Sequence, residues 1–234
     1  MSSSRAYGGQ TAEERRTQRR TALVAAALEI VGTSGHARLT VSGLCVQAGL
    51  NERYFYESFG GLDDVLLAVL DEVVADVSTA IVIAVAAAAH DAPAKAEAAI
   101  RAAVEVLTDD PRKSRVMFVE PLSAPALAAR RGAVARTFVA LILDQAEGFY
   151  GPGTSERVGA AGSFAASYLL GGLAETLTAW LRGDLEVDRD ELIERSTDLF
   201  VAVADHVIGP IGELTDHRQA ASDGRPRTDD ERHG

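Results

Sequence analysis

The chain has 234 residues, 47% of them hydrophobic and 24% charged, and a formal net charge of −11. This is the composition of an ordinary globular protein of one large or two small domains. Its single cysteine, Cys45, excludes an internal disulfide framework and a metal cluster built from cysteines, and it fits a reducing cytoplasm. Only 6% of the residues are aromatic, and Ala, Leu, Val, Glu and Arg dominate, so we expect an all-α fold.

The N-terminus and the hydrophobic segments predict neither secretion nor membrane insertion. The first ten residues, MSSSRAYGGQ, lack the apolar core of a signal peptide. The longest uninterrupted apolar run, residues 80–89, is too short to span a bilayer. Residues 158–181 contain Glu175 as their only charge, but they are rich in Gly, Ser and Thr. We expect a cytoplasmic protein without a membrane span.

Two helices are predicted near the N-terminus. Thr11 and Glu14 have the spacing of a capping box, and apolar residues recur on one face behind them, so a first helix should cover about residues 12–33. A second, short helix should begin after its cap, Thr40, and continue through Ala48, where the following glycine provides a left-handed stop.

A third short helix is predicted in the segment AGLNERYFYESF, residues 48–59, with Asn51 as its N-cap. The tyrosine hydroxyls need polar partners, and the charges between the rings argue against full burial. We therefore expect one face of this helix to point outward and the other to pack inward. The outward set is Arg53, Tyr54, Tyr56 and Glu57, and the inward set is Leu50, Phe55 and Phe59.

The remaining sequence predicts further helices separated by glycine and proline turns. They are expected at residues 63–89, 93–109, 112–119, 126–149, 155–182 and 188–208. We divide the chain into an N-terminal arm and head (1–61), a helical body (62–210) and a tail (211–234) that is expected to be disordered. Residues 1–60 carry seven Arg and five Glu, with no Lys or Asp, which leaves a modestly basic head on an acidic body.

The second and third helices, joined by Gly49-Leu50, form a helix-turn-helix pattern, in which the second element lies in the major groove of DNA. The segment LTVSGLCVQAGLNERYFYESFGGLDDVLLAVL resembles the DNA-binding signature of TetR-family transcriptional regulators. Three features agree in register with the family: Thr40, Ala48-Gly49-Leu50 and the Tyr-x-x-Phe ending at residues 56–59. The resemblance implies a helix-turn-helix head, a helical ligand-binding and dimerisation domain, and about nine helices.

Eight residues of the head are candidates for DNA contact. Arginines on the first helix attract phosphates, hydroxyls and helix N-termini bind phosphate oxygens, and the third helix reaches base edges. The alternatives are a solvated arginine face and tyrosine rings that belong to the core. The candidates are Arg16, Arg20, Thr40, Ser42, Asn51, Arg53, Tyr54 and Tyr56.

One departure from the family pattern concerns the start of the fourth helix. The family commonly has a Lys there that touches phosphate, whereas this chain has Leu62 followed by Asp63 and Asp64. The change removes a cation and adds two anions near the DNA. The same carboxylates suit the positive end of the helix dipole, which is a role in stability.

The body is expected to dimerise and to enclose an effector pocket. A head of this size reads too short a site alone, so a homodimer on a two-fold axis is expected, through the eighth and ninth helices (155–182 and 188–208). Small residues on the eighth helix and an apolar stripe that includes Leu192 and Leu199 on the ninth support this; burial within one subunit is the alternative. The pocket candidates, for which a plain core is the alternative, are Val104, Leu107, Met117, Phe118, Phe138, Ile142, Tyr168 and Glu175.

The function predicted from the sequence is a homodimeric repressor released from a palindromic operator by a small, mainly apolar effector. No cofactor or metal is expected. Two alternatives are a helical ligand-binding or adaptor protein that has lost DNA binding, and a helical-bundle enzyme. Against the enzyme, none of the five histidines follows a Glu by three residues, and the phosphate-binding and nucleophile motifs GxGxxG, GxxxxGK[ST] and GxSxG are absent from the sequence.

Overall fold

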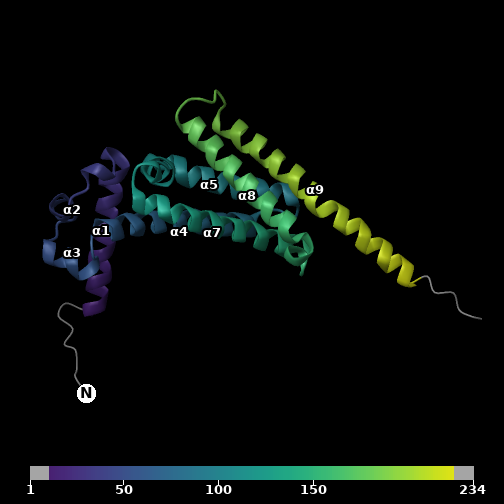
Figure 1. The fold of residues 1–234 in the computed structure, drawn as a ribbon, viewed down its shortest axis with the longest axis horizontal. Helices are drawn as coiled ribbons and strands as arrows, with labels where there is room; N and C mark the ends of the chain where they lie inside the picture. The colour runs from purple at the N-terminus through teal and green to yellow at the C-terminus, as the bar shows by residue number, and fades with distance from the viewer. Residues whose placement is uncertain (1–10, 224–234) are drawn as a thin grey trace, which may run out of the picture.

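The computed structural model describes residues 11–223, those from 209 onward by their backbone alone, and all regular secondary structure in this range is helical (Figure 1). The predicted all-α fold is confirmed. The head comprises α1 (Ala12–Ser34), the 3₁₀ turn η1 (His36–Arg38), α2 (Val41–Ala48) and α3 (Glu52–Ser58). The body comprises α4 (Leu62–Ala87), α5 (Ala92–Asp109), α6 (Pro111–Ser114), η2 (Arg115–Val119), η3 (Glu120–Leu122), α7 (Pro125–Tyr150), α8 (Thr154–Leu181) and α9 (Arg189–Asp223).

The starts of α1, α2 and α3 are fixed by local side-chain caps, as the sequence predicts. Thr11 and Glu14 form both bonds of the capping box at α1. The hydroxyl of Thr40 accepts a bond from the amide of Gly43 at the start of α2. The side chain of Asn51 caps α3 by accepting a bond from the amide of Tyr54. Each cap replaces a hydrogen bond that the first turn of a helix cannot make internally.

The longest continuous apolar surface belongs to α4, which runs from the head into the body. Its buried residues recur at spacings of three and four from Val65 to Val85, so one face is buried along the whole helix. The first half of this face packs with α1 and α3 in the core of the head, and the second half packs with α5 and α7. A second core cluster, which includes Val104 and Leu192, joins α5, α8 and α9. Leu192 was predicted on the dimer stripe, but it is buried within the subunit.

Three segments of the body differ from the expected helices. Residues 112–119 form the short helix α6 and a π-helical turn, η2, in place of one helix. Gly159 breaks the regular geometry of α8 with a φ of 49°, which glycine adopts without strain. The backbone of α9 stays helical to Asp223, past the expected end at Ile208 and into the range expected to be a disordered tail. A proline such as Pro210 removes one helical hydrogen bond, so a helix can continue through it with a kink. Residues 224–234 lie outside the described range.

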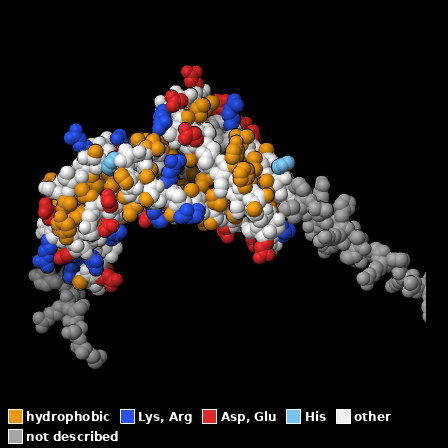
Figure 2. Space-filling view, in the orientation of Figure 1, with side chains coloured by type: hydrophobic (Ala, Val, Ile, Leu, Met, Phe, Trp, Pro, Cys, Tyr) orange, Lys and Arg blue, Asp and Glu red, His pale blue; other side chains and the backbone are white. Residues whose placement is uncertain are grey.

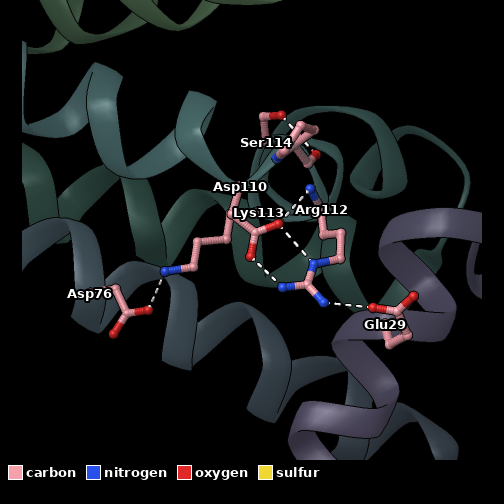
Figure 3. A network of polar contacts seen from close by, with 7 residues as sticks. Glu29, Asp76, Asp110, Arg112, Lys113 and Ser114 are labelled. Atoms are coloured by element: carbon pink, nitrogen blue, oxygen red, sulfur yellow. Dashed lines mark hydrogen bonds and ion pairs between the residues drawn. The ribbon is translucent and has the colours of Figure 1, made fainter.

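An ion-pair network joins the head to the body (Figure 3). The guanidinium of Arg112 on α6 binds both oxygens of Asp110, at 2.8 and 2.7 Å, and also contacts Glu29 on α1. The neighbouring Lys113 binds Asp76 on α4 at 2.7 Å. The bond from Arg112 holds the pKa of Asp110 below its ordinary value, although burial acts in the opposite direction. One short helix therefore fixes α1 and α4 together.

Close packing accompanies this network at Gly32. A methyl group added there would lie 2.3 Å from Cβ and 2.8 Å from Cα of Arg112, so α1 and α6 can approach this closely only with glycine at the contact.

None of the described helices combines the length and the hydrophobicity that crossing a bilayer requires.

The first prediction concerns this contact. Gly32→Ala should lower the free energy of unfolding by roughly 1–3 kcal/mol, because the backbone of α6 must move. The matched control is Gly148→Ala in α7, where no atom lies within 4 Å of the added methyl group. The control should raise stability by up to about 1 kcal/mol through helix propensity. Urea unfolding of both variants checks this, and equal effects would contradict the close contact.

Candidate functional site

The recognition element, α3, is positioned by apolar residues on its inner face. Gly49 adopts a left-handed conformation, with φ 66° and ψ 30°, and turns the chain sharply between α2 and α3. Phe55 is fully buried and Phe59 is 6% exposed, so both anchor α3 in the core of the head as predicted. In Figure 1, α2 and α3 form the end of the molecule, on the side of α1 away from the body.

The outer face of α3 presents the residues that were predicted to point outward. The side chain of Arg53 is 82% exposed and forms an ion pair with Glu57, one turn later, at 2.9 Å. Tyr56 is 62% exposed. Tyr54 is half-buried, because the guanidinium of Arg19 lies 4.4 Å from the centre of its ring. On α2, Val46 is 79% exposed, an apolar surface residue that the sequence pattern did not single out.

The arginines of α1 bind the end of α3 directly. Arg16 donates to the carbonyl of Glu57 at 3.0 Å, and Arg20 donates to the carbonyl of Ser58 at 3.2 Å. These carbonyls belong to the last turn of α3, where backbone acceptors lack helical partners and a cation complements the helix dipole. Arg16 and Arg20 thus hold α3 in place, and each keeps further N–H groups for another acceptor.

The other predicted contact residues surround the two helix starts. Ser42 is exposed on the first turn of α2, beside the capping hydroxyl of Thr40. Asn51 uses its side-chain oxygen as the cap of α3, which leaves its amide N–H groups free to donate. These residues belong to α2 or are the N-caps of α2 and α3, and both helices lie at the same end of the molecule (Figure 1).

The start of α4 shows what replaces the lysine of the family pattern. Leu62 is half-buried and packs against the core of the head. Asp64 accepts a hydrogen bond at 2.9 Å from the amide of Gly60, just ahead of the helix. Asp64 therefore stabilises the helix start, as its position suggested, while Asp63 remains exposed.

A cavity of about 560 Å³ lies in the body between α4, α5, α7, α8 and α9, with η2 and η3 also contributing to its wall. Its size falls within the usual range for small-molecule sites. The lining is mostly apolar. Six of the predicted pocket residues line it: Leu107, Met117, Phe118, Phe138, Ile142 and Glu175.

Tyr168 was predicted to line this cavity, and that prediction is wrong. Tyr168 is 72% exposed and stacks on Phe164, four residues earlier, on the outer face of α8. The inner face of α8 is instead formed by Leu170, Leu173 and Leu177, which line the cavity. Val104 is fully buried in the core between α5 and α9 and is not part of the lining.

Polar groups of the lining were largely missed from the sequence. Lys95, Arg131 and Arg182 line the cavity. Tyr150 lines it as well; burial and, second, the carboxylate of Asp205 raise the pKa of this tyrosine, so its hydroxyl stays protonated and can donate. Only the apolar periodicity was available as a signal from the sequence, and it does not reveal which charged residues border the cavity.

The cavity wall and the head share one buried carboxylate. Glu120 is 3% exposed and accepts bonds from the amide of His36 at 2.8 Å, from Nδ1 of the same residue at 2.6 Å and from Nε of Arg115 at 2.9 Å. Burial raises the pKa of Glu120, but these bonds outweigh it and hold the pKa below the ordinary value of 4.5. The adjoining Pro121 and Leu122 line the cavity, so η3 touches both parts of the protein.

Solved structures of several regulators are similar to this chain over most of its length. The fatty acid degradation regulator FadR from Bacillus halodurans has 19% sequence identity and a TM-score of 0.64, covering 78% of this chain and 94% of that chain. A TetR-family transcriptional regulator from Streptomyces coelicolor has 15% identity and a TM-score of 0.60, covering 88% and 98%. The chain has the TetR-family fold. The resemblance found in the sequence is confirmed at the level of the fold.

One further structure with the TetR-family fold was solved with a ligand. The transcriptional regulator FadR from Bacillus subtilis, in complex with stearoyl-CoA, has 20% identity and a TM-score of 0.61, covering 78% of this chain and 96% of that chain. No protein-family model and no curated protein matches the sequence.

The second prediction concerns Glu120. Glu120→Gln should lower the free energy of unfolding at neutral pH by roughly 1–3 kcal/mol, because charge-assisted bonds from His36 and Arg115 are lost. A carboxylate whose pKa is depressed on folding stabilises the protein above its unfolded pKa, and this contribution is lost as pH falls through the folded value. The difference in the free energy of unfolding between wild type and variant should therefore shrink below a pH of about 4.5. Denaturant unfolding at several pH values measures it, and a constant difference down to acidic pH would contradict the charged pairing.

Proposed function

We propose that the protein is a ligand-responsive DNA-binding transcriptional regulator. The observation that carries this proposal is the outer face of α3, where Arg53 and Tyr56 are exposed although the helix is fully anchored from behind. A second helix of a helix-turn-helix that presents an arginine and a tyrosine to solvent has the chemistry for base edges and phosphates. The contacts of Arg16 and Arg20 with α3 hold this face in a fixed orientation.

We propose further that the active form is a homodimer through α8 and α9. Phe164, Tyr168 and Leu199 are 73%, 72% and 64% exposed, which is unusual for large apolar side chains on a monomer surface. They share the outer sides of these two helices with exposed small residues such as Gly171 and Gly172, which allow close approach of another helix. Figure 2 shows hydrophobic side chains gathered over this part of the molecule.

The cavity is proposed as the effector site. A mainly apolar small molecule bound there contacts η2 and η3. These segments also hold η1 through Glu120, which binds His36 and is itself paired with Arg115. An effector that favours a conformation unable to bind the operator lowers the affinity for DNA. By thermodynamic linkage, bound DNA lowers the affinity for the effector by the same factor. The result is repression at a palindromic operator that is relieved by the effector. The complex of Bacillus subtilis FadR with stearoyl-CoA supports a ligand-binding role for this fold.

The alternative function is a ligand-binding or adaptor protein that has lost DNA binding. The observation in its favour is the start of α4, where Leu62 is packed into the core and Asp63 is exposed near the proposed DNA. A DNA-binding measurement separates the two functions.

The third prediction tests DNA recognition. Replacing Arg53 and Tyr56 together by Ala should abolish the mobility shift of a duplex taken from upstream of the gene itself, because both exposed contacts of α3 are removed. Helical content should be unchanged, since neither side chain is in the core. Arg136→Ala, which removes an exposed arginine from α7, is the control and should retain the shift. A shift by the double variant equal to that of wild type would exclude these contacts, and no shift by wild type would favour the alternative function.

The fourth prediction tests the dimer. Phe164→Glu combined with Tyr168→Glu should convert a dimer into a monomer in sedimentation velocity, because charges then face the partner helix. Ile83→Glu on α4, at a side chain that is 64% exposed, is the control and should remain dimeric. A dimer that survives the double substitution would place the interface elsewhere.

A further inference from the structure

Among residues 62–208, three arginines make no side-chain bond to the described part of the chain, and two of them line the cavity. Among the described residues 62–208, most Lys and Arg side chains form an ion pair or a hydrogen bond; Arg130, for example, binds Asp71 at 3.0 Å. Its neighbour Arg131, together with Arg136 and Arg182, has no such bond in the described part of the chain. Arg131 and Arg182 are cavity-lining residues, whereas Arg136 is not.

The net charge of the cavity lining is positive, whereas that of the whole protein is negative. The lining includes the cations Lys95, Arg131 and Arg182 and a single anion, Glu175, in a chain whose formal net charge is −11. Lys95 already donates to the carbonyl of Val85 at 3.1 Å, so Arg131 and Arg182 are the two cations of the lining that make no side-chain bond to the described residues. In Figure 2, Lys and Arg side chains border a hollow in the middle of the molecule whose floor is hydrophobic.

The interior of the cavity requires an apolar ligand body. Phe138, Leu141, Phe149 and Leu173 contribute to a wall that offers few hydrogen-bond groups. A polar ligand would lose its hydration there without replacement. A ligand that satisfies both parts of the site has an apolar chain or ring system and an anionic head, because guanidinium groups form strong charge-assisted bonds with carboxylate and phosphate oxygens.

We propose that the cavity binds an amphipathic anion, with its apolar part inside the cavity and its anionic head at Arg131 and Arg182. The inference deepens the proposed function and rests on it, since this cavity is the proposed effector site. A cationic ligand is disfavoured because the described lining contains one carboxylate, Glu175, and three cations. The anion is either a free carboxylate or a conjugate whose head carries phosphates.

The test is calorimetric titration of the full-length protein with four molecules that share a twelve-carbon chain. Dodecanoate and dodecanoyl-CoA carry the two kinds of anionic head, dodecanol is the neutral match, and dodecylamine is the cationic match. At least one anion should bind on the order of tenfold more tightly than dodecanol. Tighter binding of the thioester would assign the phosphate-bearing head, and tighter binding of dodecanoate would assign the free carboxylate.

The arginines are tested with Arg131→Gln, Arg182→Gln and the double variant, with Arg136→Gln as the matched control from α7. Each single variant should weaken binding of the anion about threefold, and the double variant should bind it no better than dodecanol. Dodecanol binding should stay unchanged in every variant, which shows that the cavity is still folded. The control should bind the anion as wild type does.

Three results would overturn the inference. They are equal binding of dodecanol and both anions, tightest binding of dodecylamine, and unchanged anion binding in the double variant. In each of these cases a small molecule still occupies the cavity and the DNA shift is measured separately, so the proposed regulator stands. Absence of binding by all four molecules would overturn the inference and would also remove the support for an effector cavity. Absence of the DNA shift alone would overturn only the proposal that the protein is a DNA-binding regulator.

Discussion

The bonds of one buried carboxylate tie the head to the body. Glu120 accepts from the backbone and ring of His36, at the end of the head, and from Arg115 in the π-helical turn. A buried carboxylate needs such partners, since an unpaired charge in this position is strongly unfavourable. Met117 and Phe118 of η2, and Pro121 and Leu122 of η3, line the cavity. Any rearrangement of that wall must therefore keep the hydrogen bonds of Glu120, and it does so most simply when η1 moves together with η3.

The packing of α4 and α6 complements this bond. The buried face of α4 is continuous from the core of the head to the cavity, so the two parts share one helix and have no flexible linker between them. Arg112 and Gly32 fix α1 against α6 at a contact that leaves no room for another carbon atom. Interfaces packed in this way shift between discrete arrangements more readily than they deform gradually.

The features that were predicted correctly from the sequence are those set by neighbouring residues. Caps at Thr11, Thr40 and Asn51 and the glycine between α2 and α3 define the head through bonds within a few residues. Apolar periodicity located five apolar residues of the cavity wall: Leu107, Met117, Phe118, Phe138 and Ile142. It failed at Tyr168, because α8 has apolar residues on both faces and spacing alone does not say which one turns inward. The bond between His36 and Glu120 spans 84 positions, and the lack of partners at Arg131 depends on how separate helices meet, so neither leaves a local pattern.

Glu57, in the last turn of α3, has a consequence for the thermodynamics of the proposed DNA complex. Arg53 and Arg19 lie 2.9 and 3.8 Å from its carboxylate oxygens, so part of the positive charge of the head is neutralised within the head itself. Binding to a polyanion gains free energy from the counterions that each unneutralised cation displaces. Arg53 and Arg19 therefore supply less of that entropy than Arg16 and Arg20, which bind backbone carbonyls and keep their charge. Discrimination between sequences comes from hydrogen bonds and groove shape, which depend only weakly on ionic strength.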